Sequence, residues 1–187
     1  SIASRSFPLP GRRNMLAESL RALAADQSIE QKSRIERYKA LLTQLLSAGD
    51  AADLTLFVEH VTSDEVALVI SRQVLQEIAA GLPSLSPETL KSIGALAIER
   101  IQPRVTSFEE QASTIREHLA DVYEREEDWA TAAKLLSGIP LDSGIRVLDD
   151  NYKVEKYIKI AMLHLQVRVG WASIWAPRPP ALCSPVG

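Results

Sequence analysis

Apolar residues recur at helical spacing between Ser107 and Pro140, with one interruption near the middle. Before the interruption they recur every three or four residues, which places them on one helix face; they are Phe108, Ala112, Ile115, Leu119 and Val122. The charged run 125–128 then marks a turn. A second apolar stripe follows, made of Trp129, Ala132, Ala133 and Leu136. The stretch therefore predicts two antiparallel helices joined by a short turn.

We expect this helical hairpin to have a core made of Leu119, Ala120, Tyr123, Trp129, Ala132 and Leu136. Small alanines permit close approach of the two helices, and the larger side chains fill the space around them. All but Trp129 match positions of the tetratricopeptide pattern, although Arg116 replaces its Trp and Pro140 comes early. The pattern indicates a degenerate tetratricopeptide-like repeat. An ordinary antiparallel hairpin in a helical bundle is the alternative.

The same periodicity predicts helices along most of the chain. They cover residues 15–25, the stretch between Ser28 and Gly49, residues 53–61, the stretches 62–81, 86–102 and 107–122, residues 129–137, and residues 152–166. Ala161 and His164 in the last helix match Ala120 and Tyr123 at an offset of 41 residues. We therefore predict an all-α fold, a superhelix of tetratricopeptide-like or HEAT-like repeats over residues 15–166.

Polar residues suggest where these helices begin and end. Three pairs have the spacing of a capping box, in which two side chains satisfy the unpaired N–H groups of the first turn: Ser28–Gln31, Thr62–Glu65 and Ser107–Glu110. Ser86 and Pro87 predict a capped helix start with proline at the first position. Gly138 is expected to end the second helix of the hairpin in a left-handed conformation.

We expect both ends of the chain to be disordered. Residues 1–14 contain prolines and a glycine without helical periodicity, and we interpret them as an extension before a natural start at Met15. Their Ser- and Arg-rich composition also fits an organelle transit peptide, which is the alternative. Residues 167–187 have four prolines among their last eleven residues, and we interpret them as a foreign reading frame.

The last predicted helix lacks a partner. In a helical repeat, the first helix needs a second one to cover its apolar side, yet the sequence after Gln166 does not supply one. Leu165 and its neighbours should therefore be partly uncovered, and the chain should be prone to association.

Charge and composition narrow the possible partners. The net charge is −3, but the arginines of both ends hide an acidic body: residues 15–166 carry all 24 acids and 16 of the 21 bases, a net charge of −8. Such a body repels nucleic acid. No apolar run reaches the roughly eighteen residues of a membrane span, so we expect no membrane partner. The single cysteine, Cys183, favours a reducing compartment.

The sequence contains no convincing catalytic or metal-binding pattern. His60, His118 and His164 lack the short spacing of a zinc site, so we interpret them as structural or solvated. The acids Glu124, Glu126, Glu127 and Asp128 stand at a predicted turn, where solvation argues against paired-carboxylate catalysis. No glycine-rich phosphate loop or nucleophile elbow occurs. We expect no catalytic residue, no cofactor and no metal; an enzyme would require two acids meeting in a desolvated pocket.

Four blocks of sequence resemble one known family. They are EVALVISRQVL (65–75), IERIQPRVTSFEEQ (98–111), IREHLADVYEREEDWATAAKLLSGIPLDSG (115–144) and YKVEKYIKIAMLHL (152–165). Together they are similar to the subunit-four family of the COP-9 signalosome, a branch of the PCI family. The similarity runs from about Met15 to Gln166 and is looser at its beginning.

This resemblance implies a right-handed helical array that precedes a winged-helix half, which is missing here. It also implies a noncatalytic scaffold and substrate-sensing subunit in the nucleus and cytoplasm. Its partners would be other signalosome subunits and the cullin-RING ligases from which the complex removes a ubiquitin-like modifier. A generic helical-repeat adaptor, such as a subunit like those of the proteasome lid, is the alternative.

Overall fold

The computed structural model describes residues 10–26, 28, 30–144 and 146–175, and all regular elements within them are helical. The α-helices are α1 (Pro10–Ala25), α2 (Gln31–Ala48), α3 (Ala51–Val61), α4 (Leu68–Gly81), α5 (Pro87–Ile101), α6 (Glu109–Arg125), α7 (Trp129–Ser137) and α8 (Asp150–Trp175). Two 3-10 helices, η1 (Leu82–Ser84) and η2 (Gln102–Ser107), lie before and after α5. The predicted hairpin corresponds to α6 and α7.

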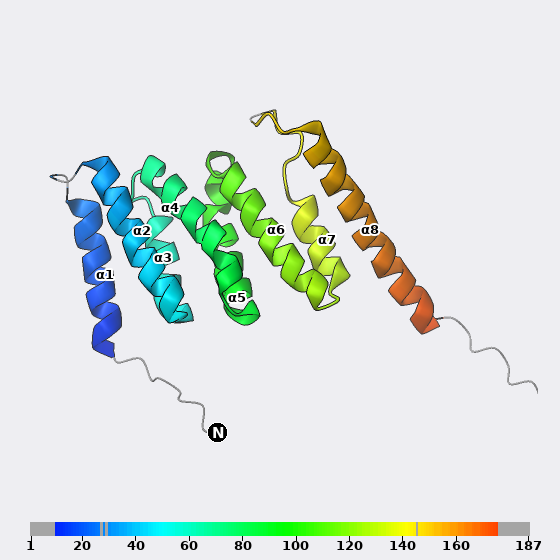
Figure 1. Cartoon of the computed structure of the whole chain (residues 1–187), viewed down its shortest axis with the longest axis horizontal. Helices are drawn as coiled ribbons and strands as arrows, with labels where there is room; N and C mark the ends of the chain where they lie inside the picture. Colours follow the sequence, from blue (N-terminus) through cyan, green and yellow to red (C-terminus); the bar gives the residue numbers. More distant parts are fainter. Residues whose placement is uncertain (1–9, 27, 29, 145, 176–187) are drawn as a thin grey trace, which may run out of the picture.

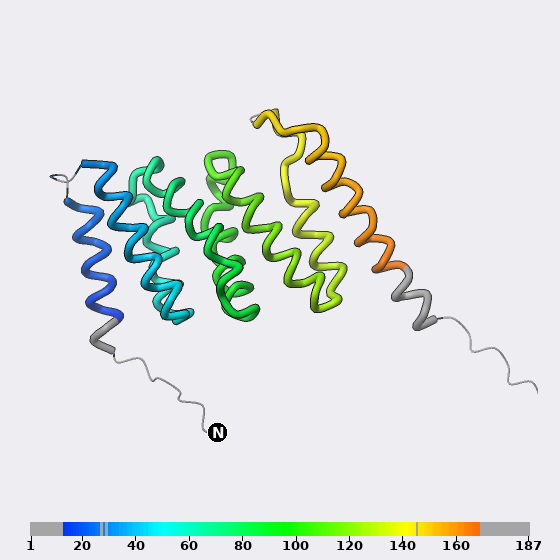
Figure 2. Tube along the Cα trace, viewed as in Figure 1, coloured from blue at the N-terminus to red at the C-terminus, as the bar shows by residue number. Residues whose placement is uncertain are grey.

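The α-helices alternate between two layers. In one layer α2 packs on α4 and α4 on α6, while in the other α1 packs on α3 and α3 on α5. The array progresses in chain order, with α1 and α8 at opposite ends (Figure 1), and the trace does not return to its start (Figure 2). This arrangement confirms the predicted all-α helical-repeat fold.

Two apolar cores run through the array. The larger core joins α1 to α6 and includes the fully buried side chains of Tyr38, Phe57 and Phe108. Burying one such side chain contributes about 1.5–3 kcal/mol. A smaller core joins α6, α7 and α8 around Leu136 and Leu163. Since α6 supplies residues to both cores, it connects the body of the array to its last two helices.

A glycine permits the close packing of α5 on α6. A Cβ atom at Gly94 would lie 2.9 Å from Cδ2 of Leu119, closer than real Cβ contacts. Glycine is unfavourable inside a helix by about 1 kcal/mol relative to alanine. The close approach of Leu119 is the physical reason for glycine at this position.

Some predicted helix boundaries are confirmed. The hydroxyl of Ser86 accepts a hydrogen bond from the N–H of Thr89 at 3.3 Å, and Pro87 is the first residue of α5. Gly49 ends α2 with a φ of 65°.

All three predicted capping boxes are wrong. α2 follows Glu30 and α6 follows Phe108, and neither helix has a side-chain cap. Thr62 ends α3, where its hydroxyl donates to the Val58 carbonyl at 2.7 Å, and α4 begins only at Leu68. The capping-box spacing missed these boundaries because the same hydroxyl groups also bind carbonyls at helix ends.

The prediction of a left-handed Gly138 is also wrong. Gly138 ends α7 with a φ of −77°, an ordinary right-handed conformation. A Cβ atom there would lie 3.1 Å from Nε of Arg116, which is only 9% exposed. Glycine at this position thus leaves room for the Arg116 side chain, which a larger residue would have to displace slightly.

The terminal helices extend beyond their predicted bounds. α1 begins at Pro10 instead of Met15, because proline is well tolerated in the first turn of a helix. α8 continues past Gln166 to Trp175, so the expectation of a nonhelical segment directly after Gln166 was wrong. The predicted disorder of residues 1–9 and 176–187 lies outside the described residues. Within the described part of the chain, no helix is long and apolar enough to cross a membrane.

One histidine belongs to the core. Nε2 of His60 lies 3.0 Å from the Tyr38 hydroxyl, and its Nδ1 lies 4.0 Å from the Glu65 carboxylate. Burial raises the pKa of Tyr38 to about 12. Burial also lowers the pKa of His60 from its ordinary value of 6.5, although the nearby Glu65 opposes this shift. His60 is therefore a structural histidine, as the sequence predicted.

We expect Gly94→Leu to lower the free energy of unfolding by about 1–3 kcal/mol, because the new side chain must displace Leu119. Leucine is a good helix former, so helix propensity alone would raise stability. Ala95→Leu, on the exposed side of the same helix, is the matched control and should leave stability within about 0.5 kcal/mol. Denaturant unfolding followed by circular dichroism measures both. Equal stability of the two variants would contradict the close packing of α5 on α6.

We expect the chain to lose stability as the pH falls from about 7.5 to 5.5. The unfolded chain takes up a proton at His60 near pH 6.5, whereas burial lowers the pKa of His60 in the folded chain, so protonation favours unfolding. In His60→Gln, the melting temperature should fall less over the same interval. Thermal unfolding across this pH series measures the difference, and parallel curves for the two proteins would disprove it.

Candidate interaction groove

α8 lies at the end of the array and leaves an apolar face open. Its main helical neighbour is α7, and Leu163 is buried against that side. Among the described side chains of α8, five large apolar residues are each at least half exposed: Val154 55%, Tyr157 50%, Ile158 55%, Met162 60% and Leu165 61%. The predicted uncovering of Leu165 and its neighbours is therefore confirmed.

The equivalence of α6 and α8, which are offset by 41 residues, explains why this face of α8 is exposed. Ala120 in α6 is fully buried in the core that α7 completes. Its counterpart in α8, Ala161, is exposed. The two helices share a pattern, but among the described residues no helix covers α8 as α7 covers α6. The open face of α8 thus corresponds to the face of α6 that α7 covers.

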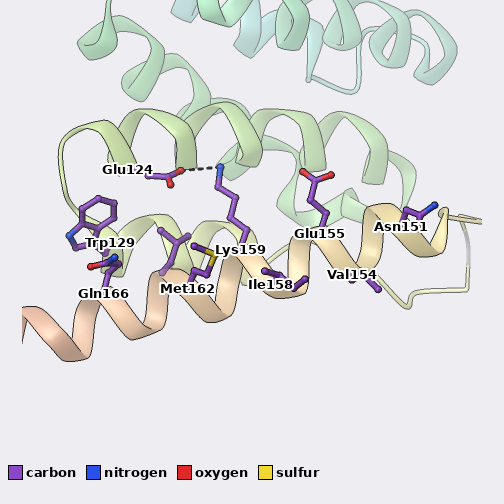
Figure 3. A pocket seen from close by; sticks show the side chains of 10 residues that line it. Glu124, Trp129, Asn151, Val154, Glu155, Ile158, Lys159, Met162 and Gln166 are labelled. Carbon is purple, nitrogen blue, oxygen red and sulfur yellow. Dashed lines mark ion pairs between the residues drawn. The ribbon is translucent and has the colours of Figure 1, made fainter.

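A groove of about 700 Å³ lies beside this face. Figure 3 shows its lining, which comes mainly from α8, with Trp129 from the start of α7 and Glu124 from α6. Ile158, Met162 and Leu163 form its apolar floor. The size and shape suit an amphipathic helix laid along the groove, in which apolar side chains at helical spacing serve as anchors.

Polar side chains hold α8 in place along α6. Glu117 accepts a hydrogen bond from the Tyr152 hydroxyl at 2.6 Å and pairs with Lys156 at 3.0 Å. One helical turn further on, Lys159 pairs with both Asp121 and Glu124, each at 3.0 Å.

Electrostatics favour the ionised form of Lys159 in its contact with Asp121 and Glu124. Burial opposes the charge of Lys159, but the hydrogen bonds to Asp121 and Glu124 outweigh it and raise the pKa of the ammonium group. Burial and the hydrogen bond to Glu117 likewise raise the pKa of Tyr152. At neutral pH Lys159 therefore stays ionised and the Tyr152 hydroxyl stays protonated. Both keep their bonds to α6, which maintain the orientation of α8 and the shape of the groove.

Of the six predicted hairpin-core residues, all but Leu119 belong to the core between α6 and α7, and Leu119 belongs to the core that α6 shares with the preceding helices. Four of them are buried, namely Leu119, Ala120, Ala132 and Leu136. Tyr123 and Trp129 are only partly buried, and Trp129 lines the groove. The predicted core and the candidate site therefore share one residue, Trp129.

The acidic turn has more structural contacts than a solvated run would have. Glu126 pairs with Lys91 of α5 at 2.7 Å, and Glu124 pairs with Lys159. Asp128 begins α7, where its carboxylate accepts a hydrogen bond from the N–H of Thr131 at 3.1 Å. This cap was not predicted, although Asp directly before an apolar stripe is a known signal of a helix start. No group of three potential metal ligands occurs among the residues that the structure describes.

The similarity to known proteins extends from α1 to α8. The profile of the family described as PSMD12/CSN4, N-terminal, matches residues 18–169. This match begins within α1 and ends within α8.

Three similar proteins carry the same name. Over 137 residues, the chain is 51% identical to COP9 signalosome complex subunit 4 of Arabidopsis thaliana, covering 73% of this chain and 34% of that protein. The same-named protein of Dictyostelium discoideum is 42% identical over 73% of this chain and 35% of its own length. That of Drosophila melanogaster is 41% identical over 72% and 34%. The chain thus spans about a third of the length of these relatives.

We expect Lys159→Met to loosen α8, because the change leaves Asp121 and Glu124 without their shared cation. The ion pairs are partly exposed, so the loss is about 0.5–1 kcal/mol. Amide hydrogen exchange in residues 150–168 should become about two- to fivefold faster. Lys134→Met, at an exposed position of α7, is the control and should leave this exchange unchanged. Equal exchange in both variants would show that Lys159 does not hold α8.

Proposed function

The chain belongs to the PSMD12/CSN4 N-terminal family, and from this premise we propose that it forms the helical arm of a noncatalytic scaffold subunit in a signalosome. The observation that carries the proposal is the family match over residues 18–169, together with 51% identity to a signalosome subunit. The matched residues form one continuous two-layer array, which suits a surface that binds other proteins.

The charges around the groove support a scaffold over an enzyme. Catalysis by carboxylates needs acids whose pKa values are separated by a desolvated pocket. Here Glu124 and Lys159, which line the groove, pair with each other, and the floor between α7 and α8 is apolar. Glu155, the other acid of the lining, is exposed and lies 3.9 Å from Lys156, so the groove holds no desolvated pair of carboxylates.

The proposed partners are other signalosome subunits and cullin-RING ligases. In this proposal, the arm holds the ligase while a different subunit removes the ubiquitin-like modifier from the cullin, in the cytoplasm and the nucleus. The acidic body, with a net charge of −8 over residues 15–166, would favour a basic surface on the ligase.

A proteasome-lid-like role is the second candidate, because the family description names PSMD12 beside CSN4. The three relatives above all carry the signalosome name, which favours the first proposal. Affinity capture of the tagged chain from cell extract separates the two: signalosome subunits should co-elute in the first case and proteasome-lid subunits in the second.

A competition experiment tests the role of the arm. The purified chain alone should leave the modifier on a cullin-RING ligase, because the proposal assigns catalysis to another subunit. Added in excess to an intact signalosome, it should slow removal of the modifier, since it occupies the ligase surface that the complex needs. The rate is measured as modified cullin remaining over time.

Phe57→Asp provides a control of the same length and nearly the same composition. Phe57 is fully buried, so the charge should unfold the array and abolish the inhibition. Equal inhibition by this variant would attribute the effect to nonspecific binding. If the folded chain neither slows the reaction nor captures signalosome subunits, the proposed function is wrong.

A further inference from the structure

The exposed apolar stripe of α8 is complementary to itself. Val154, Ile158, Ala161 and Leu165 follow one another at intervals of four and three residues, so they lie along one line of the helix. In an antiparallel pair of such helices, Val154 lies opposite Leu165 of the other copy. Ile158 then lies opposite the small Ala161, which leaves room for it. The same contacts form twice about a two-fold axis.

The charges at the two ends of α8 specify the same orientation. Asp150 and Arg168 are both exposed, and they lie about five helical turns apart, hence on the same side of the helix. Antiparallel packing brings Asp150 of each copy close to Arg168 of the other. Parallel packing would instead place like charges side by side. The helix dipoles also favour the antiparallel pair.

The lysines near the start of α8 do not disturb the charge complementarity between Asp150 of one copy and Arg168 of the other. Lys153 pairs with Asp142 at 3.1 Å, and Lys156 pairs with Glu117 at 3.0 Å, both within the same chain. The first turn of α8 therefore presents mainly acidic groups to a second molecule.

We propose that this exposed stripe of α8 packs against the same stripe of a second copy of this chain, giving an antiparallel two-fold dimer. The second helix covers the stripe and borders the groove at Val154 and Ile158. With 26 residues, α8 is about 39 Å long, enough for an extended interface. The proposal is independent of the signalosome role, because dimerisation through α8 requires no other protein.

Sedimentation velocity of residues 1–187 from about 1 to 100 μM tests the proposal, because it detects a dimer with a micromolar dissociation constant. The chain should sediment as a dimer at the upper end. Ile158→Glu places a charge in the centre of the interface and should weaken association at least about tenfold. Val147→Glu introduces the same charge at a fully exposed position before α8 and should dimerise like the unchanged chain.

Charge exchange tests the orientation. Asp150→Arg and Arg168→Asp should each weaken dimerisation about threefold or more, because each variant opposes like charges at two symmetric positions. The double variant restores both pairs and should dimerise within about twofold of the unchanged chain. Circular dichroism checks that each variant remains helical.

Three results would overturn the proposal. The first is a monomer at every concentration, and the second is a dimer that Ile158→Glu leaves intact. The third is a double variant as weak as the two single changes combined.

Discussion

Burial of α6 on two sides is the constraint on which the array depends. Leu119 and Val122 belong to the core shared with the preceding helices, whereas Ala120 belongs to the core shared with α7 and α8. Adjacent residues of one helix thus belong to different cores. Because α6 cannot move without disturbing both cores, it transmits the packing of the body to the groove at the end.

Polar side chains add a second set of contacts, which connect equivalent helices of successive repeats. Lys39 of α2 pairs with Glu77 of α4, and Glu59 of α3 pairs with Arg100 of α5. The bonds from α8 to α6 follow the same rule, with 35 residues between Tyr152 and Glu117. Each such pair is partly exposed and contributes little alone.

Much of this architecture could be predicted from the sequence, because helical periodicity records which face of each helix is buried. The stripe around Leu119 and the uncovered Leu165 were both predictable in this way. Helix starts were harder to predict, since a hydroxyl such as that of Thr62 can bind backbone groups at either end of a helix. The contacts of Lys159 with Asp121 and Glu124 could not be predicted, because charged residues so distant in sequence show no pairing pattern. The open apolar face of α8 can therefore be predicted from periodicity, whereas the polar contacts beside the groove can be seen only in the three-dimensional structure.

The alternation of layers also has a consequence for biosynthesis. From α3 onwards, each helix packs on at least one helix that precedes it in the chain, for example α4 on α2 and α6 on α4 and α5. A nascent chain leaving the ribosome therefore meets a partner surface that has already formed, and it needs no segment still to be translated. Such local contacts favour rapid folding and shorten the time during which an apolar face is open to aggregation or to chaperones. The open face of α8 shows the state that each intermediate helix would pass through during synthesis.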